Sequence, residues 1–155
     1  MIKLLMILLL LTSCNSSKNL NYYIEPQFQV FYNEFIEDLN KYNIKLYNKN
    51  VSIKVNYGNM TYKDSLAECF LDSKTIYINK DYYNYTKTFI ENDDLDDDIY
   101  YYLILKKLIY HELGHCLLNL KHSNDPNDLM YKIDNVNIFL DNPDLMLSNF
   151  FNSIK

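Results

Sequence analysis

The segment HELGHCLLNLKH, residues 111–122, contains every histidine of the 155-residue chain. Because residues four apart on an α-helix share one face, a helix here offers His111 and His115 to a single metal ion. Glu112 then stands beside the open position of that ion. A bare His-Glu-x-x-His also arises by chance, with both histidines as ordinary residues of an amphipathic helix. Three histidines within twelve residues favour the metal site.

The third metal ligand must come from another part of the chain. No glutamate follows Glu112, which excludes a site that takes a downstream glutamate from a second helix. The aspartates that follow are Asp125, Asp128, Asp134, Asp141 and Asp144. His122 lies closer along the chain than any of them. We therefore expect His111, His115 and His122 to bind one zinc ion and leave its fourth position open, the usual catalytic arrangement.

On these residues, the segment 108–131 resembles the zinc site of the metzincins, particularly their matrix metalloproteinase-like (matrixin) branch. The family motif is His-Glu-x-x-His-x-x-Gly-x-x-His, followed by a methionine in a tight turn below the metal. His111, Glu112 and His115 match it position for position, and Gly114 fits the frequent small residue before the second histidine. The resemblance implies a metzincin-like α+β domain with catalytic zinc and Glu112 as the general base.

A methionine follows the third histidine at the matrixin distance. Matrixins often have a serine after that histidine, then a few polar residues and Leu-Met-Tyr, and this chain reads HSNDPNDLMY over residues 122–131. The resemblance therefore makes Met130 the expected residue of the methionine turn, which does not bind the metal. Taken without the histidines, Met130 would be read as ordinary core packing.

The chain departs from the motif by one residue, because Leu118 and Lys121 stand where the glycine and the third histidine are expected. If the helix runs one residue further, Asn119 takes the place of the glycine. Asn is the commonest non-glycine residue in the left-handed conformation that such a helix exit needs. His122 then follows at the three-residue step of Gly-x-x-His, and a longer last turn or a bulge absorbs the added residue.

The N-terminus reads MIKLLMILLLLTSC, which has the lysine, the short apolar run and the small residues of a secretory signal. The apolar run is too short to span a bilayer. Leu11-Thr12-Ser13-Cys14 also resembles the bacterial lipobox, in which the leader is cut before a cysteine that carries lipid; an ordinary secretory leader is the alternative. We expect a lipoprotein signal peptide over 1–13, a lipidated tether over 14–24 and a zinc metalloprotease domain over 25–155.

Lipid on Cys14 would hold the exported protein at a bacterial membrane, since two or three acyl chains bury enough methylene groups for durable anchoring. Asn15 favours the outer membrane or cell surface over the inner membrane. Two cysteines remain, Cys69 and Cys116. In an exported protein such a pair can form a disulfide, and two buried free thiols are the alternative.

The net charge of the chain and its distribution restrict the classes of partner that the protein can bind. The formal net charge is -5, and acidic residues crowd into 91–98. A nucleic-acid partner needs a basic face to replace the counterions of its phosphates, and no such stripe is visible, so we expect none. Helix initiation and solvation explain most of the acidic run. A calcium site there is an alternative without further support.

The length fits one domain, and the hydrophobic pattern predicts an α+β fold. We expect helices over 27–42, over 95–119 and from Asn142 onward, and strands over 51–57, 66–71 and 75–79. The last two strands would form a hairpin at the edge of a small mixed sheet packed on two helices. The third helix would follow the metal, and residues 131–140 would form the wall of a specificity pocket.

These expectations define a function. The cleft should lie between the hairpin edge and the zinc helix, where an extended peptide could pair with strand 66–71. The sequence thus predicts a zinc-dependent endopeptidase that acts on a peptide or protein substrate. The alternative is a non-catalytic, zinc-containing peptide-binding lipoprotein. Glu112 favours the enzyme, because a structural zinc site does not need that carboxylate and usually closes its fourth position.

Overall fold

The computed structural model describes residues 22–56, 60–61, 65–90, 95–132 and 136–154. The expected signal peptide and lipidated cysteine lie outside these residues. The elements in chain order are η1 (Pro26–Phe28), α1 (Gln29–Lys41), β1 (Ser52–Asn56), β2 (Ala67–Phe70), β3 (Thr75–Asn79), α2 (Lys80–Ile90), α3 (Leu95–Leu118), α4 (Val136–Asp141) and α5 (Pro143–Ser153). The prediction of an α+β domain with a small mixed sheet is confirmed. Helices α2 and α4 were not predicted.

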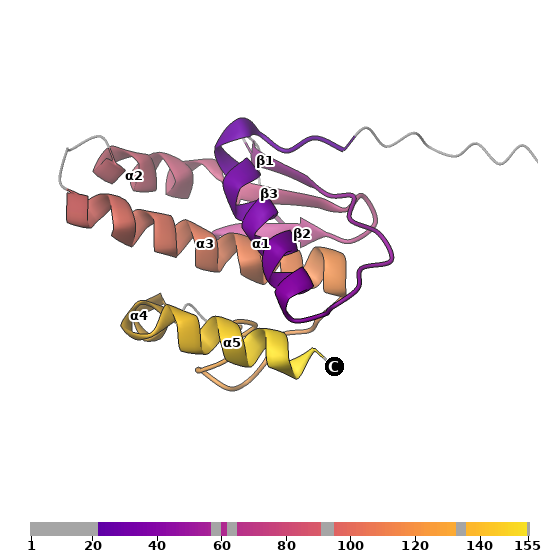
Figure 1. The fold of residues 1–155 in the computed structure, drawn as a ribbon. Coiled ribbons are helices and arrows are strands. Elements are labelled where there is room, and N and C mark those ends of the chain that lie inside the picture. The colour runs from indigo at the N-terminus through magenta and orange to yellow at the C-terminus, as the bar shows by residue number, and fades with distance from the viewer. Residues whose placement is uncertain (1–21, 57–59, 62–64, 91–94, 133–135, 155) are drawn as a thin grey trace, which may run out of the picture.

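The three strands form one sheet in the order β1-β3-β2 (Figure 1). Strand β1 is parallel to β3, whereas β2 is antiparallel to it, so Ile76 of β3 pairs with Ile53 on one side and with Cys69 on the other. The outer edge of β1 is covered in part by Ile24, which forms an isolated parallel bridge with Ile53. Strand β2 forms the opposite edge, as expected for the segment 66–71.

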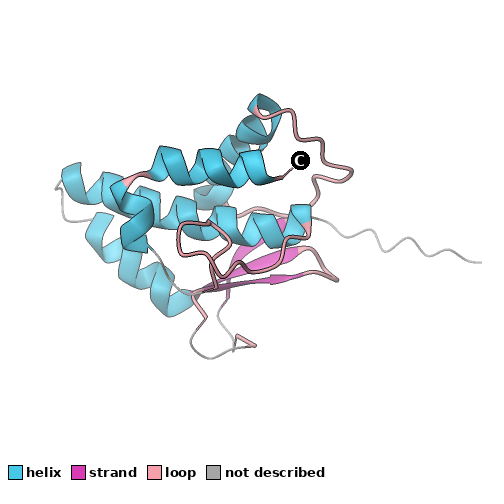
Figure 2. Ribbon diagram, turned by 90° about the horizontal axis from the view of Figure 1, so that it is seen from below, coloured by secondary structure: helices cyan, strands magenta, loops and turns pink. Residues whose placement is uncertain are grey.

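One face of the sheet is apolar. Its buried side chains are Ile53, Val55, Ala67, Ile76 and Ile78. On the other face, Ser52 and Thr75 are buried polar residues and the rest are half-buried or exposed, among them Phe70, whose ring packs edge to face on Tyr77. Because side chains alternate along a strand, only one face can supply the core. Figure 2 shows the strands together along one side of the molecule and the helices on the other.

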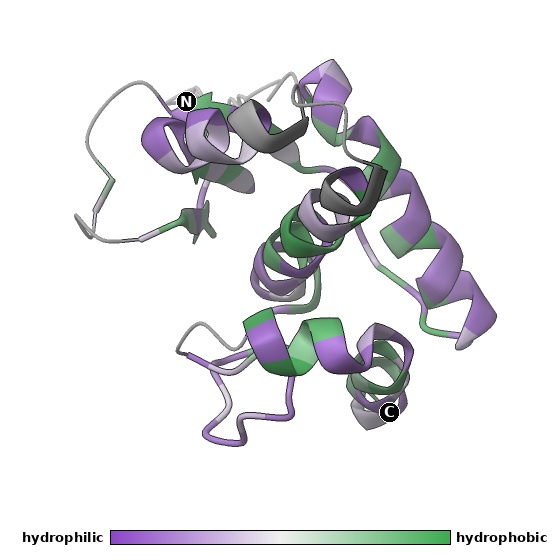
Figure 3. Ribbon diagram, turned by 90° about the vertical axis from the view of Figure 1, so that its left-hand side faces the viewer, coloured by the Kyte–Doolittle hydropathy of each residue, from purple (hydrophilic) through white to green (hydrophobic). Residues whose placement is uncertain are grey.

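Helix α3 lies at the centre of the fold and contacts β2, β3, α1, α2 and α4. Its Tyr110 meets Phe35 of α1 edge to face with ring centroids 5.0 Å apart, and the Tyr110 hydroxyl donates to Asp38 at 2.9 Å. Phe151 of α5 also packs on Phe35. Figure 3 shows apolar residues along α3, with α4 and α5 to one side of it. The helix that carries His111 and His115 is therefore fixed by packing from several directions.

The C-terminal helix begins as the sequence predicted. The Asn142 side chain accepts a hydrogen bond from the amide of Leu145 at 3.1 Å, and Pro143 occupies the first turn. Over the part of the chain that the structure describes, every helix is too short or too polar to cross a lipid bilayer.

Candidate metal centre

The three histidines converge on one point at the end of α3. Nε2 of His115 lies 3.1 Å from Nε2 of His111 and 3.1 Å from Nε2 of His122. Two nitrogens bound to one tetrahedral zinc at about 2.0–2.1 Å would lie roughly 3.3–3.4 Å apart. Among the described residues this is the one group of three or more His, Cys, Asp or Glu side chains placed to hold a metal ion. The triad therefore fits a metal ion in size and in ligand type.

The tautomers of two histidines strengthen this fit. Nδ1 of His111 lies 2.8 Å from the carbonyl oxygen of Leu129, and Nδ1 of His115 lies 2.7 Å from that of Leu120. A carbonyl only accepts, so each Nδ1 carries the proton and each Nε2 presents a lone pair. Two lone pairs 3.1 Å apart repel each other unless a positive charge lies between them. A cation shared by the Nε2 atoms removes this repulsion, and the carbonyls hold the rings in place.

Burial keeps His111 and His115 neutral. It is the main cause that lowers the pKa of His111 to about 4; the neighbouring His115 and His122 act in the same direction, and the Leu129 carbonyl acts against them. Burial also lowers the pKa of His115. Neutral imidazole is the form that binds metals, so both rings are ready to act as ligands at neutral pH.

The one-residue departure from the expected spacing is accommodated at the helix exit. Helix α3 continues to Leu118, and Asn119 has the left-handed conformation that the sequence predicted, with φ of 56°. The amide of Asn119 donates to the carbonyl of His115 at 3.1 Å, and the amide of Leu120 donates to Gly114, six residues back, also at 3.1 Å. This wide exit turns the chain back so that His122 reaches the other two histidines.

The loop after the third histidine closes on itself. The amide of Ser123 donates to the carbonyl of Met130 at 2.7 Å. The Asp128 carboxylate accepts a hydrogen bond from the amide of Met130 at 2.9 Å, and that of Asp125 accepts one from the amide of Asn127 at 2.9 Å. Both aspartates thus shape the turn. His122, and neither aspartate, is the third side chain grouped with the two histidines of α3. Met130 is buried against Gly114 of α3.

Glu112 faces β2 across a cleft. Its side chain is 6% exposed. Burial is the main cause that raises the pKa of Glu112 to about 7; the charge of Glu68 acts in the same direction, and the backbone amide of Cys69 acts against both. A buried carboxyl whose pKa lies near neutrality can both take and return a proton, as general acid–base catalysis requires.

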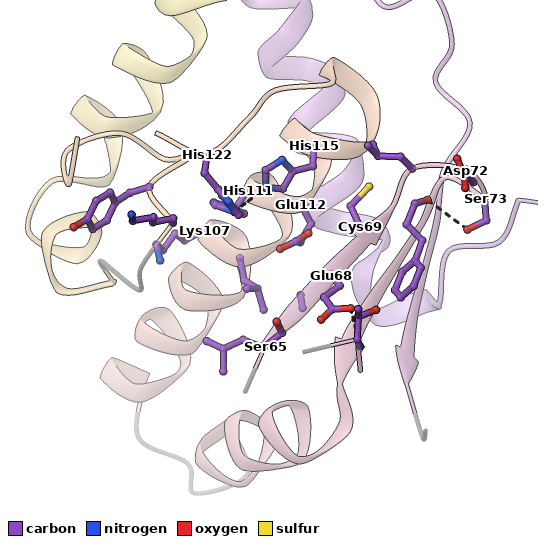
Figure 4. Close-up of a pocket in the computed structure, with 18 residues that line it drawn as sticks. Ser65, Glu68, Cys69, Asp72, Ser73, Lys107, His111, Glu112, His115 and His122 are labelled. Atoms are coloured by element: carbon purple, nitrogen blue, oxygen red, sulfur yellow. Dashed lines mark hydrogen bonds between the residues drawn. The ribbon is translucent and has the colours of Figure 1, made fainter. Parts of the chain in front are cut away.

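The cleft has a volume of about 1380 Å³ and lies between β2 and α3, where the sequence placed it. Residues from both elements line it together with His122, Tyr131 and Lys132 (Figure 4). Of the expected pocket wall over 131–140, residues 131–132 line the cleft, 133–135 are outside the described residues, and 136–140 belong to α4. An extended chain could lie along β2 with its backbone close to the histidines.

Cys69 of β2 and Cys116 of α3 are joined by a disulfide, with Cα atoms 5.7 Å apart. The sequence had left two free thiols as the alternative. The bond ties the edge strand to α3 one turn after Glu112.

Three backbone groups of the site could not be found from the sequence: the carbonyls of Leu120 and Leu129 and the amide of Cys69. Any residue type can supply such a group, so no letter marks it. Of the acidic run 91–98, considered for calcium, residues 91–94 lie outside the described residues and residues 95–98 begin α3.

Comparison of the chain with protein-family models, curated proteins and solved structures finds no match.

Proposed function

We propose that this protein is a zinc-dependent endopeptidase with a metzincin-like site. The observation that carries the proposal is the convergence of three histidine Nε2 atoms beside a buried carboxyl in one open cleft. His111, His115 and His122 would hold the ion. A structural zinc site has no use for the neighbouring carboxylate or for an open cleft.

Zinc supplies Lewis-acid chemistry when it is bound: it acidifies a water molecule and polarises the carbonyl of the peptide. Glu112 accepts a proton from the attacking water and returns it to the leaving amine. The carbonyls of Leu120 and Leu129 keep the histidine rings oriented. The water-accessible cleft gives the carboxyl a route to both water and substrate.

The substrate would bind as an additional strand. Strand β2 is at the edge of the sheet and lines the cleft, so its outward backbone groups, apart from the Cys69 amide beside Glu112, can pair with an extended peptide. Such pairing recognises any backbone and places a carbonyl beside the histidines. We therefore propose peptides or proteins in extended conformation as the substrate class.

The test is Glu112→Gln in the zinc-loaded protein, assayed against a peptide library. Gln keeps the size and polarity of the side chain but cannot take the proton of water, so turnover should fall about 10²- to 10⁴-fold while zinc content is unchanged. Glu68→Gln is the matched control: Glu68 lines the same cleft, and its carboxylate accepts from the amide of Thr61 at 3.0 Å. It should retain most of the activity. If Glu112→Gln cleaves as fast as wild type, or if zinc-loaded wild type cleaves nothing, the peptide-binding lipoprotein becomes the better description.

We also propose that the protein is exported and anchored by lipid on Cys14. The support is the lipobox-like Leu11-Thr12-Ser13-Cys14 after the apolar run. In cells labelled with radioactive fatty acid, Cys14→Ala should lose the label and leave the membrane fraction. A variant that keeps its acyl label would contradict the lipobox interpretation.

A further inference from the structure

Cys69 contacts the candidate site in two ways. Its sulfur is bonded to Cys116, and its backbone amide lies close enough to the carboxylate of Glu112 to lower the pKa of that carboxyl (Figure 4 shows Cys69 and Glu112 side by side). Glu112 and Cys116 are four residues apart on α3, so they lie on the same helical face, which here is turned toward β2. Cys69 of the edge strand therefore contacts α3 at two successive turns, the turn of Glu112 and the turn of Cys116.

The amide that Glu112 uses points away from the rest of the sheet. Leu66 accepts a hydrogen bond from the amide of Asn79 at 2.8 Å, which fixes the antiparallel hydrogen-bonding register. In such a ladder every second residue directs both backbone groups to its partner. Glu68 and Phe70 therefore turn to β3, and Cys69 turns its amide to the free edge. Pairing with β3 does not by itself hold that amide on Glu112.

We propose that the Cys69–Cys116 disulfide makes Cys69 a positioning residue for Glu112, so that the peptidase is active when the disulfide is formed and impaired when it is reduced. This inference rests on the proposed function. The covalent bond keeps the edge strand against α3 at the point where its amide orients the carboxylate. The same restraint keeps the substrate-pairing edge beside the histidines.

A second link should keep the hairpin attached after reduction. Nζ of Lys74, in the turn between β2 and β3, donates to the carbonyl of Cys116 at 2.6 Å. The sheet pairing of β2 with β3 also does not depend on the thiols. Reduction should therefore loosen Cys69 from Glu112 without unfolding the domain.

The redox step is an exchange of two electrons and two protons. A dithiol reductant converts the disulfide into two thiols and becomes a disulfide itself; a disulfide oxidant reverses the step. Reducing compartments would keep the newly made chain impaired, and an oxidising compartment would activate it. The disulfide would thus restrict proteolysis to the oxidising compartment into which the protein is exported.

The first experiment measures the contact without any activity assay. Amide hydrogen exchange of the full chain is compared with that of Cys69→Ser/Cys116→Ala, in which residue 69 still has its amide. Exchange at residue 69 should be slow in the oxidised wild type and roughly tenfold or more faster in the variant, because a hydrogen bond to a charged group is lost. The amide of Ala67, directed to the same edge by the register, is the reference. Equal exchange at residue 69 in both proteins would overturn the proposal.

If that variant folds poorly, the wild-type chain reduced by a phosphine replaces it. The phosphine takes an oxygen atom from water as the two thiols form, so the sequence remains unchanged. The same acceleration at residue 69 is expected, and its absence would again overturn the proposal.

The second experiment is a double-mutant cycle with Glu112→Gln. Loss of the disulfide should lower kcat about 10- to 100-fold in the wild-type background, with zinc content unchanged, and have little further effect in the Glu112→Gln background, because both changes act through one carboxylate. Equal losses in both backgrounds would show a general structural role and refute positioning. If wild type cleaves no peptide, the proposed function fails and the switch with it, whereas the exchange result still decides whether the disulfide positions Glu112.

Discussion

The thioether sulfur of Met130 lies against the backbone of Gly114, so close that a Cβ on that glycine would be 2.6 Å from the sulfur. The ring of Phe150 lies behind, 3.6 Å from the same point. Met130 is 3% exposed, so its side chain has little room to move aside. The small residue before His115 is therefore required by the methionine that follows the third histidine. This contact fixes the loop whose Leu129 carbonyl orients His111.

Gly114→Ala should accordingly destabilise the protein by about 1–3 kcal/mol, the usual cost of overpacking a core. It should also weaken zinc binding, because the displaced loop carries the Leu129 carbonyl. Met130→Ala in the same chain vacates the space, so the double variant should lose less stability than the sum of the two single variants. Urea denaturation of the four proteins measures this. Strictly additive losses would contradict the contact.

His122→Ala should reduce zinc affinity by about 100-fold or more, since it removes one of three protein ligands. Lys121→Ala is the matched control, because Lys121 is the exposed neighbour of His122 and is not part of the triad. Competition with a chromophoric chelator gives both affinities. Wild-type affinity in His122→Ala would return attention to Asp125 or Asp128 as the third ligand.

The clustering of the histidines could be predicted because it depends on helical spacing, which is visible in the sequence. The expected helix over 95–119 and the observed α3 differ at one residue, Asn119, which the sequence had already placed in the left-handed exit. Local rules determine such features, so they can be predicted without knowledge of the tertiary structure.

Helix α2 was missed for the opposite reason. Its residues Lys80–Ile90 include three tyrosines, two threonines and one asparagine, which are mediocre helix formers. The side chain of Asn79 accepts from the amide of Asp81 at 2.9 Å and so caps the first turn, while Tyr83 packs on Phe28 with ring centroids 5.6 Å apart. Packing against a distant part of the chain therefore stabilises α2, and the sequence of the helix alone does not reveal it.

The helix exit makes a third prediction. Asn119→Gly should be tolerated, because glycine adopts a φ of 56° without strain. Asn119→Val should cost about 1–2 kcal/mol, since β-branched residues disfavour that conformation, and it should weaken zinc binding by displacing His122. Thermal unfolding and zinc titration measure the two effects. Equal behaviour of the Gly and Val variants would show that the exit does not constrain His122.

The last prediction concerns the stability of the metal-free protein. Burial raises the pKa of Glu112 from its ordinary 4.5 to about 7. Because the folded-state value is the higher one, the stabilising effect of the protonated carboxyl is complete below pH 4.5 and is lost as pH rises through 7. The Gln side chain of Glu112→Gln does not titrate. In the presence of a chelator, the free energy of unfolding of this variant should therefore equal that of wild type near pH 4 and exceed it by roughly 3 kcal/mol at pH 8.

Denaturation at several pH values tests this, with Glu37→Gln on the exposed surface of α1 as the control that removes a carboxyl elsewhere. Zinc should reduce the difference in the free energy of unfolding between wild type and Glu112→Gln at pH 8, because a nearby cation favours the charged carboxylate and offsets the cost of its burial. A difference that stays constant from pH 4 to 8 would mean that burial does not control Glu112. The carboxyl would then lack the near-neutral pKa that suits it to exchange a proton with water and with the leaving amine.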